Sequence, residues 1–151
     1  MRRYALKIFV ALPALGLLLL ASGAVWAQGR VYEPAAGSVE RKAIMDALRK
    51  PVEIKLNRPV LFRVPPSSGF RAQNGWAFLT AELRKPDGSP MDFRGTPYAD
   101  RDHESNEGDS LLHRTQGRWR VVALALCPPD VEWGDWRRKY HAPAAIFPPT
   151  H

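Results

Sequence analysis

Acidic side chains gather in one polar stretch in the second half of the chain, and they are the residues best suited to hold a metal ion. Asp100, Asp102 and Glu104 stand at alternate positions, which is how a calcium-binding loop begins, because hard cations take several carboxylate oxygens. Ser105 occupies the position where such a loop needs glycine for its sharp turn, and Leu111 occupies the position of the closing glutamate. The sequence therefore predicts a solvated loop without a metal ion.

Two histidines flank this loop, His103 and His113, and a histidine beside an aspartate could act as a general base or bind a metal. The chain shows neither the ligand spacing of a zinc site nor the sequence of a nucleophile elbow. Cys127, the one cysteine, precedes two prolines at the end of an apolar run, which favours a packed thiol over a reactive one. We therefore name no catalytic residue, no metal ligand and no cofactor.

Basic side chains follow the acidic loop along the chain and surround a turn that contains glycine. A positive surface on an exported protein fits attraction to anionic polymers of the cell envelope, and it also fits ordinary solubility. We expect the irregular loop and the basic turn to form any binding surface together. The candidate binding residues are Asp100, Asp102, His103, Glu104, His113, Arg114, Arg118 and Arg120.

The first residues of the chain indicate export. Three basic residues precede an uncharged apolar run over residues 8–23, and Val25 and Ala27 are the compact residues that signal peptidase requires. The sequence thus predicts a signal peptide over residues 1–27, with no stable membrane anchor after its removal. The Arg2-Arg3 pair also resembles a twin-arginine export signal, so both export routes stay open.

Charge and compartment limit the partners. The chain has 151 residues and a net charge of +7, and the signal peptide holds three of its 22 basic residues and none of its 15 acidic ones, so the mature charge is +4. We expect a periplasmic or secreted protein, for which nucleic acid is a poor partner. An anionic envelope polymer or another exported protein is the partner class that remains.

Helical and strand patterns predict the elements that position these residues. After a flexible lead over residues 28–36, Ser38 can cap a helix that runs to Lys50 and is stopped by Pro51. Alternating apolar residues then indicate strands. These strand patterns cover residues 52–56, 60–64 and 75–83.

A hairpin between Leu111 and Cys127 is the expected centre of the fold. In its second half four residues alternate on one face, namely Trp119, Val121, Ala123 and Ala125, while the other face is also apolar after Arg120. A strand that is apolar on both faces is typical of the middle of a covered sheet. We therefore expect the second strand to be central and Trp119 to be buried.

The C-terminal part predicts a short helix that begins after Asp130. Trp133, Trp136 and Tyr140 would share one stripe of this helix, which is too short to be stable alone in water. A glycan-stacking platform is one interpretation, but we favour a structural clasp that packs on the core. The aromatic residues expected to be structural are Trp76, Phe78, Trp119, Trp133, Trp136 and Tyr140.

Together these patterns predict one α+β domain over residues 37–148, with an N-terminal helix on a curved antiparallel sheet of about four strands and a short C-terminal helix. The order of elements, with Gly117-Arg118-Trp119-Arg120-Val121-Val122 opening a late strand, resembles the cystatin-like and nuclear transport factor 2-like superfamilies. The chain also resembles a family of small uncharacterised exported bacterial proteins. The matching stretches are Arg41–Arg49, Gly75–Phe78, Leu111–Val122 and Asp130–Tyr140.

Two functions follow from these expectations. The first is an exported, non-catalytic binding or accessory protein of the bacterial cell envelope. The alternative is a small-molecule enzyme of the ketosteroid isomerase-like type, with an Asp/His pair near the irregular loop. A pocket lined by Trp76 and Phe78 beneath a single titratable residue would favour the enzyme, whereas a solid core there would favour the binding protein.

Overall fold

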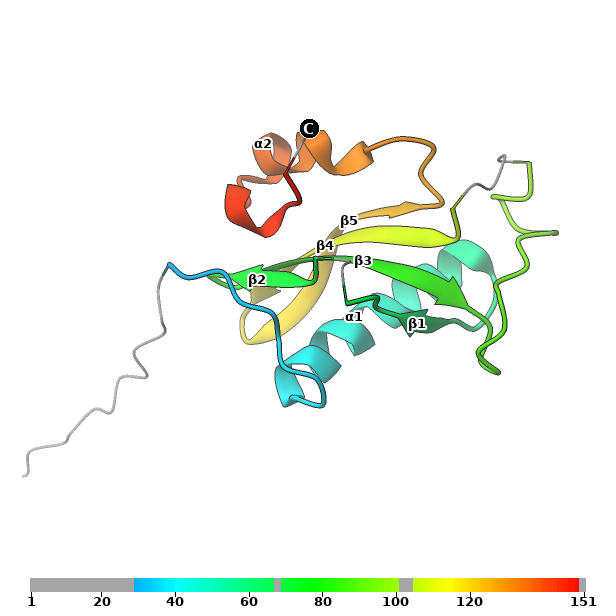
Figure 1. The fold of residues 1–151 in the computed structure, drawn as a ribbon, viewed down its shortest axis with the longest axis horizontal. Helices are drawn as coiled ribbons and strands as arrows, with labels where there is room; N and C mark the ends of the chain where they lie inside the picture. Colours follow the sequence, from blue (N-terminus) through cyan, green and yellow to red (C-terminus); the bar gives the residue numbers. More distant parts are fainter. Residues whose placement is uncertain (1–28, 67–68, 101–104, 150–151) are drawn as a thin grey trace, which may run out of the picture.

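A five-stranded antiparallel sheet lies between one long helix and a C-terminal helical segment in the computed structural model, which describes residues 29–66, 69–100 and 105–149 (Figure 1). This α+β arrangement, with its N-terminal helix and short C-terminal helix, confirms the predicted fold class. The elements in chain order are α1 (Val39–Leu56), β1 (Leu61–Arg63), β2 (Arg71–Gln73), β3 (Trp76–Arg84), β4 (Glu107–Thr115), β5 (Arg118–Leu126), the 3-10 helix η1 (Glu132–Asp135), α2 (Trp136–Tyr140) and the 3-10 helix η2 (Ala144–Ile146).

Helix α1 begins where we predicted, because the Ser38 hydroxyl accepts a hydrogen bond from the backbone N–H of Arg41 at 3.1 Å. Its end was predicted wrongly, since the helix includes Pro51 and runs to Leu56, so the strand expected over residues 52–56 does not exist. The side chains buried by α1 recur every four residues. Burying Val52 and Leu56 offsets the cost of about 3 kcal/mol that a proline inside a helix carries.

The strands follow the order β1-β3-β4-β5, and β2 also pairs with β3. The hairpin of β4 and β5 is present as predicted, but β5 lies at the edge of the sheet, so its central position was a wrong prediction. Strand β5 is apolar on both faces because α1 packs against one face and the C-terminal segment packs against part of the other. Helices on its two faces, and not a second neighbouring strand, therefore explain why β5 has apolar residues on both sides.

A β-bulge in β5 changes which residues share a face. Leu111 pairs with Ala123 but Leu112 pairs with Val121, so Val122 is the extra residue. Before the bulge Trp119 and Val121 contact the core under α1, and after it Leu124 and Leu126 do so. The predicted face of Trp119, Val121, Ala123 and Ala125 is therefore wrong from Ala123 onward, because one inserted residue reverses the alternation.

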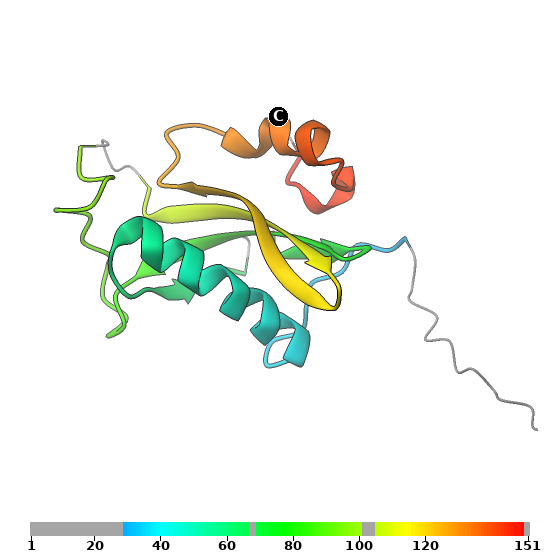
Figure 2. The same cartoon turned by 180° about the vertical axis from the view of Figure 1, so that it is seen from behind.

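The C-terminal segment, which consists of η1, α2, η2 and the residues that join them, covers the face of the sheet opposite α1 (Figure 2). Phe78 of β3 is fully buried there, with ring centroids 5.8 Å from Trp133, 6.4 Å from Trp136 and 5.2 Å from Phe147. Tyr140 and Trp76 lie at the border of this cluster and are half-buried. The aromatic residues that we expected to be structural thus join the two layers, except Trp119, which lies on the α1 side.

Residues 29–36, which belong to the lead that we predicted to be flexible, make several bonds to the domain. The Asn74 and Gln73 side chains hydrogen-bond the backbone of Gly29, and the backbones of Tyr32 and Ala72 exchange two hydrogen bonds. These bonds connect the described part of the lead to β2 and to the turn that follows it. The predicted signal peptide lies outside the described residues, and within the described part no helix is long and apolar enough to cross a membrane.

Candidate functional site

Four polar or aromatic side chains form one row across the sheet at the end where the hairpins turn. Strand register pairs Gln73 of β2 with Trp76 of β3, Trp76 with His113 of β4, and His113 with Arg120 of β5. Side chains that are paired in this way point to the same face, which here is the face that carries the C-terminal segment. The row spans three strand spacings, or about 14 Å. It lies beside the next row inward, where Phe78 and Leu111 are buried.

The middle of the row is a stacked pair of rings. The ring centroids of Trp76 and His113 are 4.0 Å apart, and their planes differ by 14°. Both side chains are half-buried, whereas Arg118 and Arg120 are exposed. Within the described ranges, the side chains of these two arginines make no hydrogen bond or ion pair. At this end of the sheet the stacked Trp76–His113 pair therefore lies beside two exposed guanidinium groups that have no partner among the described residues.

Arg114 belongs to a different surface from the other candidate arginines. It pairs with Trp119 in the register of β4 and β5, and Trp119 packs under α1, so Arg114 points to the α1 face. Its Nε donates to the backbone oxygen of Gly117 at 3.4 Å. The structure thus brings His113, Arg118 and Arg120 together, adds Trp76 to them, and separates Arg114.

The opposite end of the same face is acidic. Asp109 of β4 is only 7% exposed and accepts a hydrogen bond from the hydroxyl of Thr80 at 2.6 Å. Burial raises the pKa of Asp109, and the nearby negative charges of Glu107 and Glu132 raise it further, although the Thr80 hydrogen bond lowers it. Strand β4 begins at Glu107, so the strand holds Asp109 against the core.

Replacing Asp109 with asparagine should raise the midpoint of thermal unfolding at pH 7. Folding raises the pKa of this carboxyl group, so the folded state loses stability as the pH rises from the ordinary pKa of aspartate through the raised one. An asparagine amide stays neutral and can still accept the hydrogen bond from the Thr80 hydroxyl, so it avoids this loss. The gain should shrink as the pH falls toward 3, where the carboxyl is protonated in both states. Asp100→Asn, at an exposed position, is the control for the change in net charge. An equal gain at pH 3 and pH 7 would contradict the assignment.

The expected Asp/His pair does not form among the residues that the structure covers. Asp109 and His113 share one face of β4, but Leu111 lies between them, and four residues of strand separate them by about 13 Å. Asp100 is exposed in a turn. Asp102, His103 and Glu104 lie outside the described residues, so a pair that involves them stays a prediction. In the described ranges no three His, Cys, Asp or Glu side chains are grouped closely enough to hold a metal ion.

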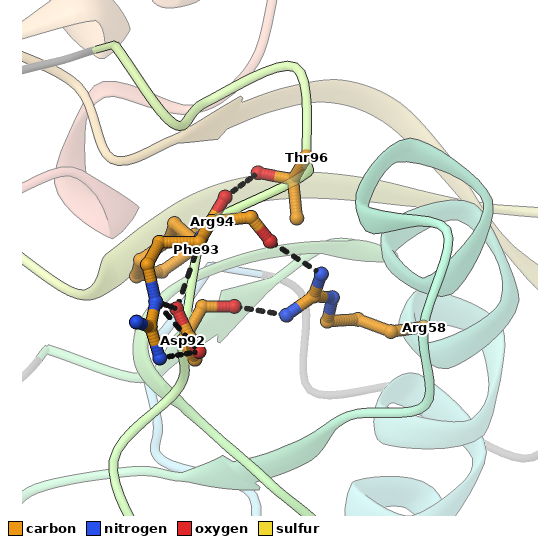
Figure 3. A network of polar contacts seen from close by, with 5 residues as sticks. All are labelled: Arg58, Asp92, Phe93, Arg94 and Thr96. Carbon is orange, nitrogen blue, oxygen red and sulfur yellow. Dashed lines mark hydrogen bonds and ion pairs between the residues drawn. The ribbon is translucent and has the colours of Figure 1, made fainter.

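Arg58 anchors the connection between β3 and β4 to the end of α1 (Figure 3). Its guanidinium donates to the backbone oxygens of Asp92 and Arg94, the latter at 2.9 Å, and the Arg94 and Asp92 side chains form an ion pair at 2.7 Å. Shallow depressions of about 540 Å³ and about 370 Å³ lie beside Arg58 and Pro59. Both terminal nitrogens of Arg58 are occupied by this anchor, so we assign it a structural role.

Sequence reasoning missed two features that register creates. Trp76 was expected to be structural only, and its contact with His113 joins residues 37 positions apart, which no local pattern encodes. Strand β2 was also missed, although Asn74-Gly75 is a strong signal for a tight hairpin turn, and both residues have positive φ values of 51° and 78°. Recognising that signal would have placed Gln73 beside Trp76.

Comparisons with protein-family models, with curated proteins and with solved structures gave no match. The resemblance to small exported bacterial proteins and to the cystatin-like and transport factor-like superfamilies therefore stays a prediction. Function has to be inferred from the geometry of this chain alone.

Proposed function

We propose that this protein is an exported, non-catalytic binding or accessory protein of the bacterial cell envelope. The observation that carries the proposal is the packed aromatic layer that the described residues form over the sheet. Phe78 has no exposed surface, and Trp133 stacks on Phe147 above it with ring centroids 6.1 Å apart and planes 16° apart. A ketosteroid isomerase-like enzyme would need a ligand cavity at this place, whereas a binding protein can use the surface beside it.

The enzyme alternative retains one supporting observation, which is the buried carboxyl group of Asp109 with its raised pKa. Perturbed carboxyl groups are common in active sites. At Asp109, however, the only described side-chain partner is the Thr80 hydroxyl, and the aromatic cluster fills the adjoining part of the face. A single buried acid with no second group to take part in proton transfer favours a structural role for Asp109 over a catalytic one.

The direct test is incubation of the mature protein with envelope material isolated from its host. We expect the protein to sediment with this material and to leave the chemical composition of the material unchanged, as measured by mass spectrometry of the recovered glycan and lipid fractions. Chemical conversion that depends on Asp109 would favour the enzyme instead.

Export has its own test. Protein recovered from the native host should begin at Gln28, because the basic start, the apolar run and the residues before this position fit cleavage by signal peptidase. The measurement is intact mass after separation of the periplasm and medium from the membrane and cytoplasm. Protein that still carries residues 1–27 in the membrane fraction would contradict the export route.

A further inference from the structure

We infer that the outer end of the sheet is a binding strip for a linear anionic polysaccharide, meaning a glycan chain that carries carboxylate or phosphate groups. The strip consists of Trp76, His113, Arg118 and Arg120, and this inference rests on the proposed binding function. It names the surface that binds and the chemistry of the ligand.

The first argument is the chemistry of the strip. The indole N–H of Trp76 and the guanidinium groups of Arg118 and Arg120 are hydrogen-bond donors, and none of the four side chains is a carboxylate. Such a surface suits a ligand that is rich in acceptor oxygens and negatively charged. Guanidinium groups bind carboxylate and phosphate in particular, because their paired N–H groups match two oxygens at once.

The second argument is the spacing of the charges. Arg118 and Arg120 lie two residues apart on β5, so their side chains leave the same face about 7 Å apart along the strand. The row from Trp76 to Arg120 runs across the strands, at right angles to this pair. A ligand with charges at regular intervals can therefore contact both arginines while its neutral part lies against the aromatic pair.

The third argument is the separation of charge on this face of the sheet. Asp109 and Glu107 lie at the far end of β4, and the aromatic cluster under the C-terminal segment fills the space between them and the strip. The carboxylates therefore neither pair with the strip arginines nor lie beside an anion bound there. Since Arg118 and Arg120 have no side-chain partner in the described part of the chain, binding would break no internal ion pair.

A polysaccharide fits better than a lipid surface. The strip contains half-buried aromatic rings that offer polar edges, and its exposed members are arginines. Insertion into lipid would require large exposed apolar side chains around the basic groups. In β5 the apolar neighbours Val122 and Ala123 are small and only partly exposed.

The test measures binding of polygalacturonate, a linear polyuronate, to the mature protein by calorimetry at low salt, with dextran as the neutral control. We expect Arg118→Gln combined with Arg120→Gln to weaken binding about fivefold to tenfold, which is the sum expected for two exposed ion pairs. The matched control combines Lys50→Gln with Lys55→Gln on α1, where two exposed positive charges are removed from another surface. This control should bind like the unmodified protein.

Nuclear magnetic resonance supplies a readout that does not depend on mutation. The indole N–H signal of Trp76 and the backbone signals of His113 and Arg120 should shift on titration with polygalacturonate, while the signals of Lys50 and Lys55 stay in place. Equal losses in both double variants would show that only net charge matters and would overturn the strip. Equal binding of dextran, or binding of phosphatidylglycerol vesicles without binding of polygalacturonate, would overturn the ligand class. Sedimentation of the mature protein with envelope material from the host tests the proposed binding function separately.

Discussion

Replacing Trp136 with alanine is expected to lower the free energy of unfolding by about 3 to 5 kcal/mol, the range typical of removing a buried aromatic side chain. Trp136 is 8% exposed and packs edge-on against Phe78, although it lies on a helix of only five residues. A helix of this length is not stable in water by itself, so contacts with the sheet must hold it. Loss of this contact should release the C-terminal segment and expose Phe78.

Denaturant titration followed by circular dichroism measures this effect. Arg137→Ala, at the next and exposed position, is the control and should stay within about 0.5 kcal/mol of the unmodified protein. Binding of polygalacturonate per folded molecule should be largely kept in Trp136→Ala, because Trp136 is not part of the strip and, of the strip residues, only Trp76 borders the aromatic cluster. A variant that kept its stability but lost glycan binding would make the C-terminal helix a stacking platform.

Replacing Trp119 with alanine is expected to destabilise the domain by a similar amount, about 3 to 5 kcal/mol. Trp119 is 9% exposed and belongs to the core between α1 and the sheet. Its burial comes from α1, which packs against β5, so the edge position of this strand does not weaken the expectation. A loss of this size would unfold many domains whose total stability is about 5 to 15 kcal/mol.

The control for Trp119 is Arg120→Ala, which changes the next residue on the opposite and exposed side of β5. Its effect on the free energy of unfolding should stay within about 0.5 kcal/mol. Trp119→Phe should give an intermediate loss, because a smaller ring leaves a smaller cavity. If Trp119→Ala itself stayed within about 1 kcal/mol of the unmodified protein, α1 would not depend on this contact.

Local pattern was sufficient wherever neighbouring residues decide the structure. The Ser38 cap and the tight turn at Gln116-Gly117 both depend on residues only a few positions apart in the chain. The α+β class followed from one helical period and then repeated alternation. Misplacing the end of α1 shows the limit of such reasoning, because Val52, Ile54 and Leu56 satisfy the alternation of a strand, and only packing decides that Ile54 is exposed.

The candidate site depended on strand register, which the local sequence does not encode. His113 and the arginines were identified from their types, but the sequence placed Arg114 with Arg118 and Arg120 and left Trp76 apart from them. Pairing of β3 with β4 brings Trp76 to His113, and pairing of β4 with β5 turns Arg114 to the other face. Register is set by contacts between strands far apart in sequence, and a single bulge residue, Val122, reverses the alternation. Sequence by itself therefore determined the α+β class, the main hairpin and the residue types of the candidate site. Tertiary structure decided where α1 ends and which side chains meet.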